Sequence, residues 1–129
     1  MDVTPLIPQG KQVIDAYGDG GFRVSGTRVE GSVIVFPDRL FAWRIAALSE
    51  VNLVMLEQVR SAGVAGQVDL LLLGTGPRMA QIDRGLRQDL RAAGVVIEVM
   101  DTGAACRTYN VLLAEGRAVV AALLFERGG

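Results

Sequence analysis

The chain has 129 residues, half of them hydrophobic, and a formal net charge of −1 at pH 7. This length predicts one domain with one core, and the charge excludes a general attraction to nucleic acid or anionic lipid. Histidine is absent and Cys106 is the one cysteine. The sequence therefore excludes an intrachain disulfide and lacks the commonest general base and metal ligand.

The sequence also carries no sign of export or membrane insertion. No apolar run approaches the ~18–20 residues that a membrane helix needs. The N-terminal stretch has neither the basic and apolar regions of a secretory signal nor the Arg- and Ser-rich composition of a transit peptide. Together with the single cysteine, this predicts a cytoplasmic protein. We expect no metal and no cofactor.

The first third of the chain predicts an antiparallel meander after an irregular lead-in over residues 1–11. Turns that contain glycine or proline separate short apolar stretches, a pattern typical of strands. The strands are predicted over residues 13–17, 22–24, 28–36 and 40–45. Gly31 is expected to form a bulge or kink inside the third of them.

From residue 40 onward, strands and helices alternate. Apolar residues at helical spacing predict three helices, the first of them capped by Ser49. The helices are predicted over residues 50–62, 79–93 and 102–114, and interior strands over residues 69–73, 95–100 and 117–125. The order β-α-β-α-β-α-β predicts an α/β fold, a single domain over residues 1–129 with a mixed central sheet that follows the N-terminal antiparallel meander.

Two glycine-containing turns lie at strand ends, where α/β sheets usually bind ligands. Gly74-Thr75-Gly76 begins like the dinucleotide fingerprint Gly-x-Gly-x-x-Gly, but Met79 stands where the third glycine belongs. This favours an ordinary strand-to-helix turn over a nucleotide site. Asp101-Thr102-Gly103 is the second turn, and helix capping alone explains Asp101 and Thr102. Gly103 and Gly76 would let a small ligand approach the backbone between the two turns.

A small-anion site between the two turns is the functional interpretation of this pattern. Free N–H groups at two helix starts, Pro77–Arg78 and Thr102–Gly103, would add to the guanidinium groups of Arg78 and Arg107. The alternative is that Arg107 and Asn110 are ordinary surface residues. The candidate ligand-binding residues are Gly74, Thr75, Gly76, Arg78, Asp101, Thr102, Gly103, Arg107 and Asn110. No residue is predicted to be catalytic.

Three other features have simpler interpretations. Cys106 shares a helix face with Tyr109 and Leu113, which predicts a buried, unreactive thiol. The arginines of the helix over residues 79–93 are expected to form a solvent-exposed face. Trp43 of the meander is expected to pack in the core.

The chain resembles a widespread family of small domains of unknown function that includes a mitochondrial complex I assembly factor and an adipogenesis-associated vertebrate protein. The matching segments are Leu72-Leu73-Gly74-Thr75-Gly76, Gly94-Val95 to Met100-Asp101-Thr102, Ala104 to Leu112, and Glu115-Gly116-Arg117. The block Thr108-Tyr109-Asn110 is the more specific part. The resemblance implies an α/β domain with a mixed central sheet, helices on one side and a β-hairpin packed against it.

For function, the resemblance implies binding to other proteins during the maturation of respiratory complexes, and it attaches no catalytic residue. We therefore expect a non-enzymatic protein-binding domain, such as an assembly factor for a respiratory or other membrane complex. The alternative is a small-molecule or anion-binding protein or enzyme that uses the cleft between residues 74–78 and 101–107. The lack of histidine and of a clustered acid pair weakens hydrolytic and acid–base schemes. The identity of the protein partner does not follow from the sequence.

Overall fold

The computed structural model describes residues 10–126, so most of the lead-in predicted over residues 1–11 lies outside the described part. The chain forms two sheets. A three-stranded antiparallel sheet has the order β1-β2-β3, and a five-stranded mixed sheet has the order β5-β4-β8-β6-β7. The strands are β1 (Ile14–Gly18), β2 (Gly21–Val24), β3 (Thr27–Glu30), β4 (Ser32–Val35), β5 (Leu40–Trp43), β6 (Leu70–Gly74), β7 (Val96–Met100) and β8 (Val119–Leu123).

The five-stranded sheet is parallel on one side and antiparallel on the other. β6 pairs in parallel with both β7 and β8, while β4 pairs antiparallel with β8 and β5. The central strands β4 and β8 are buried along their whole length. Continuous runs such as Val119–Leu123 are typical of strands that are covered on both faces. The predicted α/β fold with a mixed sheet is confirmed.

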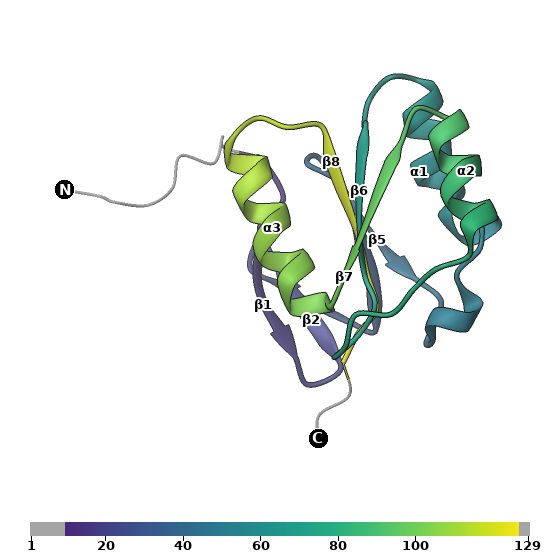
Figure 1. The fold of residues 1–129 in the computed structure, drawn as a ribbon. Helices are drawn as coiled ribbons and strands as arrows, with labels where there is room; N and C mark the ends of the chain where they lie inside the picture. Colours follow the sequence, from purple (N-terminus) through teal and green to yellow (C-terminus); the bar gives the residue numbers. More distant parts are fainter. Residues whose placement is uncertain (1–9, 127–129) are drawn as a thin grey trace.

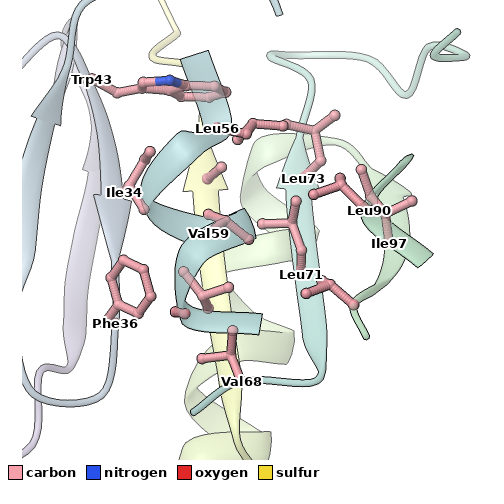
Figure 2. Close-up of a cluster of buried hydrophobic side chains, with 14 of the residues drawn as sticks. Ile34, Phe36, Trp43, Leu56, Val59, Val68, Leu71, Leu73, Leu90 and Ile97 are labelled. Carbon is pink, nitrogen blue, oxygen red and sulfur yellow. The ribbon is translucent and has the colours of Figure 1, made fainter. Parts of the chain in front are cut away.

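Both faces of the large sheet are covered (Figure 1). Helices α1 (Glu57–Val64) and α2 (Arg84–Ala92) lie on one face, and α3 (Thr102–Ala114) lies on the other beside the three-stranded sheet. Figure 2 shows part of the cluster under α1 and α2, where Leu71 and Leu73 of β6 face Val59 and Leu90. The implied arrangement with helices on one side is therefore wrong, because α3 packs with β1 and β2 on the opposite face.

The predicted strand over residues 28–36 is two strands in two different sheets. β3 ends at Glu30 and β4 begins at Ser32, and Gly31 between them has a φ of +80°. Residues that carry a side chain rarely adopt this left-handed backbone conformation, whereas glycine adopts it readily. The kink expected at Gly31 thus moves the chain from the small sheet to the large one.

The first helix begins later than predicted. Two short 3₁₀ turns, η1 (Leu48–Glu50) and η2 (Val54–Leu56), precede α1, which begins at Glu57 rather than Glu50. Ser49 does not act as the N-cap. The Glu50 carboxylate instead accepts hydrogen bonds from the N–H groups of Ala46 and Ala47, and this holds the chain in a turn.

The second helix also begins later, at Arg84 rather than Met79. Its N-cap is Asp83, whose carboxylate accepts a hydrogen bond from the Leu86 N–H at 3.1 Å. Between β6 and α2 the Thr75 side chain supplies hydrogen bonds to the backbone of the loop. The hydroxyl of Thr75 donates to the Arg78 carbonyl at 2.6 Å and accepts from the Ala80 N–H at 3.2 Å. This local alternative competes with helix formation.

Candidate functional site

The residues predicted to form the site, except Asn110, gather at the edge of the large sheet where β6, β7 and β8 end, the lower edge in Figure 1. Asn110 lies further along α3. At that edge the loop that follows β6 meets the first turn of α3. Gly74 permits close contact, since a Cβ on it would lie 2.9 Å from the Cα of Thr102. The structure therefore brings together the two predicted turns.

The hydroxyl of Thr102 lies at the centre of this edge and is fully buried. It accepts a hydrogen bond from the Gly76 N–H at 2.8 Å and donates one to the Leu124 carbonyl at 2.8 Å. The Thr102 N–H in turn donates to the Gly76 carbonyl at 2.8 Å. One side chain thus joins the loop after β6, the start of α3 and the segment that follows β8.

Several backbone N–H groups at this edge already have partners within the fold, among them that of Thr102. The N–H of Gly76 donates to Thr102, and the N–H of Thr75 donates to the Met100 carbonyl at 2.9 Å. Asp101 is the N-cap of α3, and its carboxylate accepts from the Ala104 N–H at 2.8 Å. The helix start expected at Pro77–Arg78 is absent, because α2 begins at Arg84. The predicted pair of helix N-termini is therefore wrong.

Asn110 joins helix α3 to the three-stranded sheet. Its Oδ1 accepts from the Ile14 N–H at 3.0 Å, and its Nδ2 donates to the Ile14 carbonyl at 2.8 Å. The neighbouring Tyr109 hydroxyl, on a buried side chain, donates to the Gln12 carbonyl at 3.0 Å. Both side chains satisfy backbone groups of β1 and the residues before it, so α3 binds the small sheet through polar as well as apolar contacts.

Arg107 contacts Tyr17, a residue that the sequence pattern does not place at the site. The Arg107 Nη1 donates to the Tyr17 hydroxyl at 3.0 Å. That hydroxyl lies over Gly103, where a Cβ would come within 2.5 Å of it. Tyr17 belongs to β1, and nothing in the sequence indicates that β1 lies against the start of α3. The Tyr17 ring therefore covers part of the predicted cleft.

Arg78 and its neighbours form the exposed part of the site. Pro77 and Arg78 are exposed, and Met79 is 55% exposed. Within residues 10–126 the Arg78 side chain makes no hydrogen bond or ion pair. Two cavities of about 440 and 400 Å³ are lined by residues outside the predicted site. No group of acidic, Cys or His side chains in the described part of the chain could hold a metal.

Cys106 lies in the core on the inner face of α3, with 2% of its surface exposed. Burial raises the pKa of the thiol from its ordinary value of 9.0 to about 12. The Glu126 carboxylate adds to this increase, and Arg107 opposes it. Because the thiolate is the reactive form, this environment favours a structural role.

We predict that Cys106 resists a thiol reagent in the native protein at pH 8 and reacts fully only after unfolding in guanidinium. The raised pKa also has a consequence for stability. As the pH rises, the thiol loses its proton in the unfolded chain before it does so in the folded protein. The contribution of Cys106 to the free energy of unfolding therefore falls between about pH 9 and pH 12. Rapid stoichiometric labelling of the native protein would contradict this prediction.

Replacing Thr102 by valine should destabilise the protein by at least about 2 kcal/mol, because the Gly76 N–H and the Leu124 carbonyl would lose their buried partner. Denaturant unfolding measures the effect. Thr102→Ser is the matched control, since it keeps the hydroxyl and should retain most of the stability. A loss in Thr102→Ser with none in Thr102→Val would show that the methyl group matters and the hydroxyl does not.

The comparisons with known proteins agree with this arrangement. A family described as protein of unknown function (DUF498/DUF598) matches residues 14–124. An uncharacterized protein of Rhodobacter capsulatus is 41% identical over 119 residues, which cover 89% of this chain and 86% of that protein. The NADH dehydrogenase [ubiquinone] 1 alpha subcomplex assembly factor 3 of Xenopus tropicalis is 32% identical over 111 residues, which cover 86% of this chain and 60% of that protein. The chain thus spans less than two thirds of the assembly factor's length.

A solved structure extends the likeness to the fold. A Bordetella pertussis protein described as a Mth938-like domain superposes with a TM-score of 0.83 at 30% identity, covering 100% of this chain and 95% of that one. The resemblance to a family that includes a complex I assembly factor is confirmed, while the likeness to the adipogenesis-associated protein stays a prediction. By the span of the family match and the identity to these relatives, the chain belongs to the DUF498/DUF598 family of proteins of unknown function.

Proposed function

We propose that this protein binds a protein partner as an assembly factor for a respiratory NADH dehydrogenase. The observation that carries the proposal is its 32% identity over 111 residues to an assembly factor of that enzyme. The internal hydrogen bonds of the candidate site support it. Thr75, Thr102 and Asp101 use their polar groups within the fold, which leaves the exposed surface as the means of recognition.

The surface suited to a protein partner lies around the C-terminal end of β6 and the first turn of α3. Met79 is 55% exposed and Tyr17 is 40% exposed, and the cationic side chains of Arg78 and Arg107 are also exposed. Methionine, aromatic residues and arginine are the residue types enriched in protein–protein interfaces. We call these four residues the Met79 surface.

A small anion at the same place is the second interpretation. Arg78 has no partner within the described residues, and one helix N-terminus, that of α3, lies at this edge. A single helix start and exposed arginines would bind phosphate only weakly, at about millimolar concentration. A phosphate titration followed by NMR separates the two interpretations. Saturable shifts at residues 75–79 and 102–107 would favour the anion.

The protein is also expected to work in the cytoplasm. None of the helices in the described residues is long and apolar enough to cross a membrane. Fractionation of the host's cells tests the expected location, because a cytoplasmic protein would remain in the supernatant after membranes are sedimented. Recovery in the membrane pellet after a salt wash would contradict it.

Deletion of the gene in its host should lower the amount of assembled NADH dehydrogenase seen on a native gel, and the wild-type gene should restore it. The double variant Arg78→Glu/Met79→Asp should fail to restore the complex, because it reverses the charge and removes the apolar contact of the Met79 surface. Val54→Asp is the control, since Val54 is 79% exposed in η2 and is not one of the four residues of the Met79 surface. Unchanged assembly after deletion would overturn the proposal.

A further inference from the structure

A second feature of the surface lies at the opposite end of the large sheet, where β6 and β8 begin (upper end in Figure 1). A cavity of about 440 Å³ opens there. Three loops and the start of the described chain form its wall, namely the β4–β5 turn, the α1–β6 loop, the α3–β8 loop and Lys11. Its volume falls within the ~300–1,000 Å³ of typical small-molecule sites.

The floor of the cavity is apolar. Phe36, Val68 and Leu113 line it and are exposed by only 1%, 4% and 2%. Phe36 and Val68 belong to the cluster under α1 and α2, drawn in Figure 2, and Leu113 belongs to the cluster under α3. The cavity therefore borders both halves of the core, and an apolar group seated in it would leave water for partly apolar surroundings.

The rim of the cavity is cationic. Its charged members are Lys11, Arg39 and Arg117 against the single carboxylate of Asp38, a local charge of 3 − 1 = +2. The whole chain, by contrast, has a formal charge of −1. Like charges around one opening repel each other, and a bound anion would relieve that repulsion.

Only one of the three cations is already paired. The Arg39 Nη1 lies 2.7 Å from the Asp38 Oδ1, and the guanidinium carbon lies 4.1 Å from the centre of the Phe36 ring. This fixes Arg39 across the apolar floor. Within residues 10–126, Lys11 and Arg117 make no side-chain hydrogen bond or ion pair. Their charges are available to a ligand.

We propose that this cavity binds a small organic anion, whose carboxylate, phosphate or sulfonate group pairs with Lys11 and Arg117 and whose apolar body packs on Phe36, Val68 and Leu113. Charge-assisted hydrogen bonds supply the recognition of the anionic group, and the apolar floor selects against inorganic ions. This site is separate from the Met79 surface and does not depend on the assembly role.

The test is an NMR titration of the full chain with three probes. 2-Naphthoate has both an anionic group and an apolar body, 2-naphthamide has the same body without charge, and inorganic phosphate has the charge alone. We expect saturable shifts with 2-naphthoate at residues 36–39, 67–68 and 113–118. Binding of the amide and of phosphate at these amides should be weaker by about tenfold or more.

Variants establish which cations contribute. Lys11→Gln/Arg117→Gln should weaken 2-naphthoate binding by about tenfold or more, because both free charges are lost. Arg84→Gln/Arg91→Gln is the matched control. It removes the same charge from exposed positions on α2 and should leave binding unchanged.

Three results would overturn the proposal. One is the absence of shifts at the cavity up to about ten millimolar probe, the affinity range of a single weak ion pair. Another is equal binding of 2-naphthoate and 2-naphthamide, which would show that charge plays no part. The third is an equal loss of affinity in the two double variants, which would mean that the chain's overall charge and not the rim attracts the anion.

Discussion

The buried hydroxyl of Thr102 holds together the end of the large sheet at which the candidate site lies. This fully buried oxygen accepts a hydrogen bond from the Gly76 N–H and donates one to the Leu124 carbonyl. It thereby joins the loop after β6, the start of α3 and the segment after β8. A buried hydroxyl without these partners would lower the free energy of unfolding. The Gly76 N–H and the Leu124 carbonyl would do the same if the hydroxyl were removed. Gly74 lets the segments approach closely enough for the bonds to form.

The hydrogen bonds of Thr102 limit which groups remain at the surface of this edge to contact another molecule. With Thr75, Asp101 and Thr102 all engaged in the fold, the edge offers side chains of the loop tip and of Tyr17 to a partner, and few free backbone donors to a ligand. The opposite edge differs, because its cavity combines unpaired cations with an apolar floor. The two proposals therefore assign protein contact to the ends of the parallel strands and small-anion binding to their beginnings.

Much of the fold could be predicted from the sequence, because β6 and β8 are continuous apolar runs and glycines such as Gly94 and Gly116 follow the helices. The helix starts were harder to predict. α2 is delayed to Arg84 by the hydroxyl of Thr75, which binds the backbone of Arg78 and Ala80, and spacing alone gives no sign of such a contact. The sequence also indicates that Thr102 and Gly76 lie at neighbouring strand ends. It does not indicate that Asn110 bonds to Ile14 or that Arg107 bonds to Tyr17, since both contacts depend on the tertiary packing of β1 against α3.

Amide hydrogen exchange at Gly76 tests the central claim most directly, namely that the buried Thr102 hydroxyl closes this edge of the sheet. Gly76 follows β6 in a loop, and its N–H has no backbone partner in a strand or helix, so the Thr102 oxygen is its protecting acceptor. The account predicts that this amide exchanges as slowly as those of Leu72 and Leu73 in the centre of β6. Exchange as fast as at exposed Met79 would contradict it and would show that the loop opens freely.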